Sequence, residues 1–435
     1  MGFSRFGLSV VAYSDFINDI RNEFAVCGGS ISRATSPAAF FVAAATHHYG
    51  MRIRAYSPWC RILHIGLFKK NCYVSSCKSS ACAVYSYHAG VGDIPRIYME
   101  IVVGIACCYI GVFLLCTIMV CFSTTRSNNH NARISVCVPF RNERDHLDSN
   151  CRSLRNLNDT DYEILYSDDH SDDDSSAICE QHGFSVIRVT QGQGKLAALA
   201  AAVEKADGEI IVFTDADCVV TRSWLTALRN NLHDDVGLYV GAVAVERMPV
   251  MTLDFLCLVG VASALNTLGI PSSCPGANIA VKKSLFMEFY TNTASIHATE
   301  DAALLHYIHS TLRQKVRFIF SREHMVTTQP YTSVREFFSQ RLRWVKGGIR
   351  LNPLLTVYLF FILTAHGLFF AFPSLLWVPV SCAAVFTLCV TVRMRHFSLL
   401  PFVPLYAIFF PIYTTLVGIL YPFAGRSLQW KGRSL

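Results

Sequence analysis

Long stretches without a charged residue are the feature that most limits how this chain can fold. Residues 101–122 form one such stretch, and as a continuous α-helix it would be about 33 Å long, enough to cross the hydrocarbon core of a bilayer. Residues 353–392 form another, long enough for two crossings with Pro373 at the turn, and residues 397–425 offer one more. We therefore expect an integral membrane protein with one span at 101–122 and a C-terminal membrane region, 353–425, of two or three spans.

The composition supports this membrane assignment. Apolar residues make up 52% of the 435 residues and charged residues 16%, whereas soluble proteins carry about 25% charged residues. The net charge is +7, and Lys and Arg gather beside the apolar stretches, as in proteins that meet a membrane surface. The basic residues are not interleaved with aromatic residues as in RNA-binding segments, so nucleic acid is not an expected partner.

Residues 1–98 have a mixed composition and no recognisable motif. We expect them to be a poorly ordered or non-native extension, and translation from Met99, directly before the first span, is the alternative.

The 17 cysteines of the chain lack the paired spacing of a zinc site. Those within 101–122 fall in an apolar stretch, where cysteine behaves as a small hydrophobic residue. Scattered thiols favour a reducing compartment, and thus a cytosolic catalytic region.

The pattern changes between residues 133 and 350, where short apolar runs alternate with helical stretches. The runs are 134–138, 163–166, 184–189 and 209–213, and the helical stretches include the Ala-rich 195–206. Such alternation predicts an α/β domain with a mostly parallel sheet and helices on both faces. Ligands of these folds gather at the carboxyl ends of the strands. Because acidic motifs directly follow these predicted strands, we expect the motifs to share one site.

Two pairs of carboxylates follow predicted strands. Asp215 and Asp217 come directly after the apolar run 210–213, and carboxylate oxygens at such a position suit Mg²⁺ or Mn²⁺ bound to a diphosphate. Asp168 and Asp169 follow the second run. The alternatives are solvated loop acids for the first pair and an acidic helix N-terminus for the second.

Two further segments carry charged residues suited to catalysis. Glu300 and Asp301 follow Thr299, and one of their carboxylates could abstract a proton from a substrate. The alternative is a pair of acids that stabilises the N-terminus of a helix. Lys195 follows two glycines but precedes Leu196, so this segment lacks the Ser or Thr of a Walker phosphate loop. Lys195 could approach a nucleotide, and a solvated lysine is the alternative.

A basic amphipathic stretch, 333–350, precedes the C-terminal apolar residues and contains Gln340, Arg343 and Trp344 at QxxRW spacing. The planar donors of arginine suit a diphosphate, and tryptophan can form an apolar wall beneath an acceptor. The same residues could anchor a helix in the headgroup layer. The apolar stretch 251–270 contains Asp254, which favours a buried or interfacial helix over a span.

These motifs, in this order, resemble those of the membrane-bound family 2 glycosyltransferases, which have a GT-A fold and include ceramide glucosyltransferase-like and polysaccharide synthase-like members. The resemblance implies a catalytic domain at 133–350 in which Asp301 is the general base and Asp215 and Asp217 bind Mg²⁺ or Mn²⁺. It further implies an acceptor side shaped by residues 275–278. The nucleotide would contact Asn142, Glu143, Asp168, Asp169, Lys195 and Asp215, and the acceptor or diphosphate would contact Glu300, Gln340, Arg343 and Trp344.

The resulting hypothesis is an inverting transferase that moves a sugar from a nucleotide sugar, expected to be a UDP-sugar, to a lipid or glycan acceptor at the membrane. A processive polysaccharide synthase is the close alternative. A transport protein with a nucleotide-sensing domain and a non-catalytic scaffold are alternatives from other classes. With a cytosolic catalytic domain and three late spans, Arg426, Lys431 and Arg433 would lie outside, against the positive-inside rule, so one late segment could be re-entrant.

Overall fold

The computed structural model describes part of the chain and divides it into two units, Met1–Tyr98 and Met99–Leu435. The expected extension before residue 93, Thr299, Arg426 and Lys431 lie outside the described residues. The described ranges are 93–122, 131–270, 272–293, 300–351, 353–423, 429–430 and 433–434.

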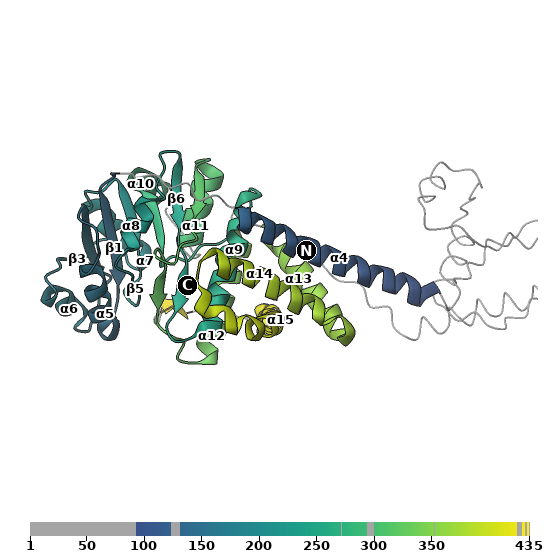
Figure 1. The fold of residues 1–435 in the computed structure, drawn as a ribbon. Coiled ribbons are helices and arrows are strands. Elements are labelled where there is room, and N and C mark those ends of the chain that lie inside the picture. Colours follow the sequence, from purple (N-terminus) through teal and green to yellow (C-terminus); the bar gives the residue numbers. More distant parts are fainter. Residues whose placement is uncertain are drawn as a thin grey trace, which may run out of the picture. The chain divides into compact units, whose positions relative to one another are not determined.

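A mixed seven-stranded sheet forms the centre of the α/β part of the chain, which lies on the left of Figure 1. Its order is β3-β2-β1-β4-β8-β6-β9, and β8 is antiparallel to both of its neighbours while the other neighbours run parallel. The predicted mostly parallel α/β sheet is thus confirmed. The strands are β1 (Ile134–Phe140), β2 (Tyr162–Asp168), β3 (Val186–Arg188), β4 (Ile210–Phe213), β6 (Val236–Val240), β8 (Ile279–Lys282) and β9 (Lys315–Phe318).

Helices cover both faces of this sheet because successive strand residues point to opposite sides. In β1, Val136 packs in one core cluster with helices α5 and α8, whereas Cys137 packs in the other with α7, α10 and α11. Strands β1, β4 and β6 are buried throughout, as expected when both faces are covered. The helices are α5 (Arg144–Arg155), α6 (Ser175–Gln181), α7 (Lys195–Lys205), α8 (Trp224–Arg229), α10 (Lys283–Asn292) and α11 (Glu300–His306), which continues as a π-helix, Tyr307–Thr311.

A second, small sheet lies beside the ends of the large one. It consists of β5 (Val219–Val220), β10 (Val326–Thr328) and β7 (Val243–Val245), in that order. Since β5 begins two residues after Asp217 and β10 ends at Thr328, this sheet holds the loop that follows β4.

Five helices among the described residues are long and apolar enough to cross a membrane: Tyr98–Phe122, Pro249–Thr267, Leu354–Ala371, Pro373–Arg393 and Phe397–Phe423. They correspond to α4 (Asp93–Phe122), α9 (Pro249–Thr267), α13 (Pro353–Ala371), α14 (Trp377–Arg393) and α15 (Val403–Leu420), with short 3₁₀ turns at Pro373–Leu375, Phe397–Phe402 and Tyr421–Phe423. The amphipathic helix α12 (Val334–Leu351) precedes α13, and a short hairpin, β11 (Gln429–Trp430) and β12 (Arg433–Ser434), follows α15. Asp254 is the one charged residue of helix α9 (249–267), and it is completely buried.

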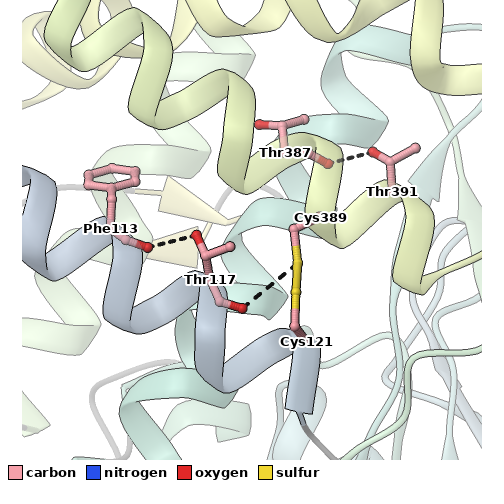
Figure 2. The surroundings of a disulfide bond; sticks show 6 residues. All are labelled: Phe113, Thr117, Cys121, Thr387, Cys389 and Thr391. Carbon is pink, nitrogen blue, oxygen red and sulfur yellow. Dashed lines mark hydrogen bonds between the residues drawn. A yellow bond between two sulfur atoms is a disulfide. The ribbon is translucent and has the colours of Figure 1, made fainter.

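A disulfide between Cys121 and Cys389 joins the end of α4 to α14, with 6.7 Å between the two Cα atoms (Figure 2). The sequence analysis treated Cys121 only as a small hydrophobic residue, and here the structure differs. The two cysteines are separated by 268 residues, so no local spacing pattern could indicate the pair. Nearby, the hydroxyl of Thr117 donates to the carbonyl of Phe113 at 2.7 Å, which satisfies this polar group inside its own helix.

The burial of His324 in the α/β part of the chain makes the stability of the fold depend on pH. Its ring is buried, stacks on the Trp224 ring with 5.9 Å between centroids, and has Nδ1 3.0 Å from the Trp224 carbonyl oxygen. Burial lowers the pKa of His324 to about 4, whereas an unfolded histidine binds a proton near pH 6.5. Between these values only the unfolded chain is protonated, so the folded state loses about 3 kcal/mol as the pH falls from 6.5 to 4.

We therefore expect His324→Gln to flatten the pH dependence of the unfolding free energy between pH 6.5 and 4, because glutamine has no proton to bind in that range. Glutamine can still donate to the Trp224 carbonyl. Chemical denaturation of the detergent-solubilised protein across this range measures the effect, with His146→Gln, at a partly exposed position, as the control. An unchanged slope in the His324 variant would contradict the assignment.

Candidate active site

Acidic and basic side chains from three segments meet at one edge of the large sheet. Asp215 follows β4, Lys195 begins α7 and Glu300 begins α11. The Nζ of Lys195 lies 2.7 Å from Asp215 Oδ1 and 3.2 Å from Glu300 Oε1. These three residues, predicted from separate motifs, are therefore brought together by the fold.

The surroundings of Lys195 stabilise the charged form of its side chain. Its side chain is 18% exposed, and although burial opposes the charged form, the nearby carboxylates of Asp215 and Glu300 outweigh it and hold the pKa of Lys195 well above its usual value. The ammonium group thus balances two acids of the site before any ligand enters.

Asp301 lies beside this group, against the loop that precedes β8. Its Oδ2 accepts a hydrogen bond from the Gly276 N–H at 3.0 Å, and its Oδ1 accepts from the Ala302 N–H at 2.7 Å. A Cβ at position 276 would lie 3.0 Å from Asp301 Oδ2 and 3.3 Å from Lys195 Nζ. A side chain at this position would push against both groups, so the close approach of the loop to the carboxylate favours glycine.

A small cavity adjoins these polar groups. Lys195, Glu300 and Asp301 lie at its polar end, and most of the wall is apolar. The apolar lining residues are Leu196, Leu199, Phe213, Ile279, Phe286, Phe289 and Leu304. An apolar wall next to a carboxylate lowers the local dielectric, which strengthens its interactions with ligand charges and protons.

Asp217 is partly buried and faces the small sheet. Its Oδ2 accepts a hydrogen bond from Thr328 Oγ1 at 3.2 Å, and its Oδ1 lies 3.4 Å from the Cys218 thiol. Within the described ranges, no three His, Cys, Asp or Glu side chains converge as a metal-ligand group. Asp215 and Asp217 supply carboxylate oxygens, the type of ligand that Mg²⁺ takes when phosphate and water complete its shell.

The predicted nucleotide residues of the second loop are buried at the end of β2. Asp168 accepts hydrogen bonds from the Ser171 N–H at 2.8 Å and from the Ser176 hydroxyl at 2.7 Å, so its carboxylate organises its own loop. Asp169 Oδ1 accepts from the Gly194 N–H at 2.8 Å. This bond ties the loop after β2 to the turn that presents Lys195.

The loop after β1 is hydrogen-bonded to the loop that follows β2. Asn142 donates its N–H to Ser171 Oγ at 3.1 Å, and its Oδ1 accepts from the Asp172 N–H at 3.0 Å. Glu143 donates its N–H to Ser175 Oγ at 2.8 Å. The backbone at Asn142 has φ 52°, a left-handed conformation that asparagine tolerates better than most residues. All the predicted nucleotide residues thus follow neighbouring strands at one edge of the sheet.

The predicted residues of α12 have different surroundings. Gln340 Oε1 accepts hydrogen bonds from the Tyr331 hydroxyl at 2.7 Å and from Arg341 Nη1 at 2.8 Å. The ring of Trp344 packs edge-on against Phe255 of α9, with 5.3 Å between centroids. In this structure Gln340 and Trp344 therefore bind neighbouring helices and loops of the protein.

Arg343 is partly buried and interacts electrostatically with the two acids that begin α11. Burial lowers the pKa of its guanidinium, and the carboxylates of Glu300 and Asp301 act in the opposite direction, so the group lies in the field of both acids. For the part of the chain that the structure describes, Arg343 Nε is buried without a hydrogen-bond partner. A buried donor of this kind is costly unless a ligand satisfies it.

Sequence reasoning did not identify the partners of two buried polar groups, Asn278 and Asp254. Asn278 is fully buried, and its amide donates to the carbonyls of Ala242 at 2.9 Å and His324 at 2.6 Å. Arg341 pairs with Asp254. An aspartate in an otherwise apolar stretch was the available signal for the second, since a buried charge needs a partner, but the sequence did not identify that partner.

Comparisons with known proteins agree with this architecture. Residues 135–251 match the family model described as glycosyl transferase family 2. A mannosyltransferase from Pyrobaculum calidifontis, solved with GDP-Man and Mn²⁺, has a similar structure at 16% sequence identity, with a TM-score of 0.50 over 74% of this chain and 98% of that one. Glucosyl-3-phosphoglycerate synthase from Mycobacterium tuberculosis, solved with Mn²⁺, UDP and glucosyl-3-phosphoglycerate, is 16% identical with a TM-score of 0.38 over 51% and 81% of the two chains. No curated protein matches the chain.

Proposed function

This chain carries a family 2 glycosyltransferase domain with a GT-A fold, and we propose that it transfers a single sugar from a UDP-sugar to a lipid acceptor at a membrane surface. The expected enzyme class, glycosyltransferase, is confirmed by the family match. The observation that carries the proposal is the meeting of Lys195, Asp215 and Glu300, with Asp301 beside them, at the carboxyl ends of the strands.

The donor would bind across the loops that follow β1, β2 and β4. Asn142, Glu143, Asp168 and Asp169 hold these loops in place and present their backbone to the nucleoside. Asp215 and Asp217 would hold Mg²⁺ or Mn²⁺, which neutralises charge on the departing diphosphate. The mannosyltransferase with a similar fold was solved with Mn²⁺, which supports a divalent cation here. Arg343, with its unpartnered buried donor, would bind diphosphate oxygens.

Asp301 would act as the general base. Its carboxylate takes the proton of the acceptor hydroxyl while that oxygen attacks the anomeric carbon, and the bond from this carbon to the diphosphate oxygen breaks. The attack comes from the face opposite the leaving group, so the anomeric configuration inverts. The Gly276 N–H holds Asp301 Oδ2, which fixes the carboxylate before the acceptor arrives.

The position of α12 supports a membrane acceptor. This helix carries Gln340, Arg343 and Trp344 and leads within two residues into α13, whose residues 354–371 are apolar and long enough to span a bilayer. An acceptor hydroxyl bound near Trp344 would therefore lie close to the headgroup layer. We place the catalytic domain on the cytosolic side of the membrane.

Donor and product identity are tested directly with membranes that contain the protein. Labelled UDP-glucose, UDP-galactose, UDP-N-acetylglucosamine and GDP-mannose are supplied in turn with Mn²⁺ or Mg²⁺. Label in the lipid extract, with stoichiometric release of nucleoside diphosphate, is expected for one UDP-sugar. Label in a high-molecular-weight polymer would favour the processive alternative, and an absence of turnover with every donor would contradict the proposal.

A further inference from the structure

A buried ion pair joins α12 to two of the apolar helices. Asp254 of α9 is completely buried and accepts a hydrogen bond from Arg341 Nη2, which is itself 4% exposed. The same carboxylate accepts hydrogen bonds from two tyrosines of α15, Tyr406 at 3.1 Å and Tyr413. One carboxylate thus fixes three helices to one another.

The guanidinium of Arg341 is also enclosed by aromatic rings. Its central carbon lies 4.4 Å from the ring centroid of Trp344, 4.7 Å from that of Phe337 and 5.2 Å from that of Phe255. Nη1 donates to Gln340 Oε1 at 2.8 Å. Cation–π contacts in a desolvated site are stronger than those at an exposed surface. Arg341 therefore contacts two residues of the QxxRW motif, Gln340 and Trp344, from outside the catalytic pocket.

Arg341 and Arg343 leave α12 on nearly opposite sides. Two residues along an α-helix correspond to a rotation of about 200°. Arg341 binds Asp254 of α9, whereas the charge of Arg343 interacts with the acids Glu300 and Asp301 of α11. Helix α12 packs against α11, α13 and α15. The ion pair therefore lies on the side of α12 away from Arg343.

The position of Asp254 is itself fixed from the catalytic domain. Two residues earlier in α9, Thr252 Oγ1 accepts a hydrogen bond from the Val245 N–H of β7 at 3.0 Å. Strand β7 pairs with β10, which carries the Thr328 that bonds to Asp217. A continuous set of contacts therefore runs from the loop after β4 to the Asp254 carboxylate.

We propose that Arg341, through its ion pair with Asp254, is a positioning residue that sets the orientation of α12 and so holds Arg343 and Trp344 at the transferase site. This inference rests on the proposed function. Stability gives little reason for the pair, because a buried ion pair is often replaced by apolar residues without loss of stability. A role in orientation explains why charge is retained among aromatic rings and apolar helices.

The test replaces the pair by an apolar one. Asp254→Leu with Arg341→Met fills a similar volume and leaves no buried charge, whereas each single variant leaves one charge without its partner. We expect the double variant to recover most of the melting temperature that the single variants lose. Its kcat is expected to stay about 10- to 100-fold below the wild type, since small misplacements of catalytic groups have effects of this size. The KM for the donor is expected to rise as well, because Arg343 is the residue proposed to bind the donor diphosphate and it is displaced in this variant.

A second measurement shows whether Arg341 acts through Arg343. We expect Arg343→Lys to reduce kcat strongly in the wild-type chain and only weakly in the double-variant background, because there the guanidinium is already displaced. Equal effects in both backgrounds would contradict the inference, since residues that act independently have additive effects.

The matched control is Arg229→Met, which breaks a buried pair with Asp159 (2.8 Å between Nε and Oδ2) at the end of α8. It should lower the melting temperature and leave kcat unchanged.

The outcomes separate the inference from the proposed function. If the wild-type protein turns over no nucleotide sugar, the proposed function fails. If the wild type is active and the double variant regains both its melting temperature and its kcat, the pair is only structural and the inference is overturned. If the double variant does not fold, the Tyr413→Phe variant tests the inference instead, because it removes one hydrogen bond to Asp254 and keeps the ion pair. A several-fold fall in kcat is then expected, and an unchanged kcat overturns the inference.

Discussion

Asp301→Asn is expected to reduce kcat by about 10²- to 10⁴-fold, the range that a positioned general base contributes. Asparagine keeps an oxygen that can accept the Gly276 N–H, whose bond to Asp301 is 3.0 Å long in this structure, so the loop before β8 should remain in place. What is lost is the carboxylate that takes the acceptor proton. Donor binding should be preserved, because the nucleotide loops follow β1, β2 and β4.

The measurement combines product formation with the affinity for the nucleoside diphosphate. A large fall in the rate of sugar transfer with an unchanged affinity for the diphosphate is the expected result. Glu288→Gln, at an exposed carboxylate of α10, is the control and should leave both quantities as in the wild type. A fully active Asp301→Asn variant would contradict the base assignment and would direct attention to Glu300, the neighbouring acid bound to Lys195.

The fold of the catalytic domain could be predicted to the extent that local patterns specify it. The runs 134–138 and 209–213 became β1 and β4 because short β-branched stretches with turn residues around them favour buried strands. Strand β8 runs antiparallel between β4 and β6, and its pairing depends on residues far apart in the sequence, which periodicity does not report. The order and direction of the strands beyond β4 therefore required the structure.

The same distinction applies to the candidate site. The sequence showed that Lys195 could contact a nucleotide or lie in solvent, and only the three-dimensional arrangement places its ammonium group between Asp215 and Glu300. Asp254 was evident as an acid in an apolar stretch, but its partner Arg341 is 87 residues away. Charge in an apolar context indicates that a partner exists, whereas the identity of the partner depends on how helices pack.

Asp217→Asn is expected to weaken Mn²⁺ binding and to reduce kcat by about 10²- to 10³-fold, because metal coordination supplies several kcal/mol of charge stabilisation to the departing diphosphate. Asp217 gives a clearer test of the metal site than Asp215. Asp215 is paired with Lys195, so its removal would also free the ammonium group to bind other acids. Asp217 accepts a hydrogen bond from the neutral hydroxyl of Thr328, whereas the acids that hold the pKa of Lys195 high are Asp215, Glu300 and Asp301.

The measurement is Mn²⁺ affinity by electron paramagnetic resonance, with and without nucleoside diphosphate, alongside the rate of transfer. Thr328→Val serves as the graded control: it removes the 3.2 Å hydrogen bond that orients Asp217 and should cost about tenfold in affinity, as is typical for groups that orient a metal ligand. The two variants therefore should rank in a fixed order, with the loss of the ligand larger than the loss of its support. Unaltered Mn²⁺ affinity in Asp217→Asn would place the cation elsewhere, and a larger defect in Thr328→Val than in Asp217→Asn would mean that the small sheet, rather than the carboxylate, maintains the site.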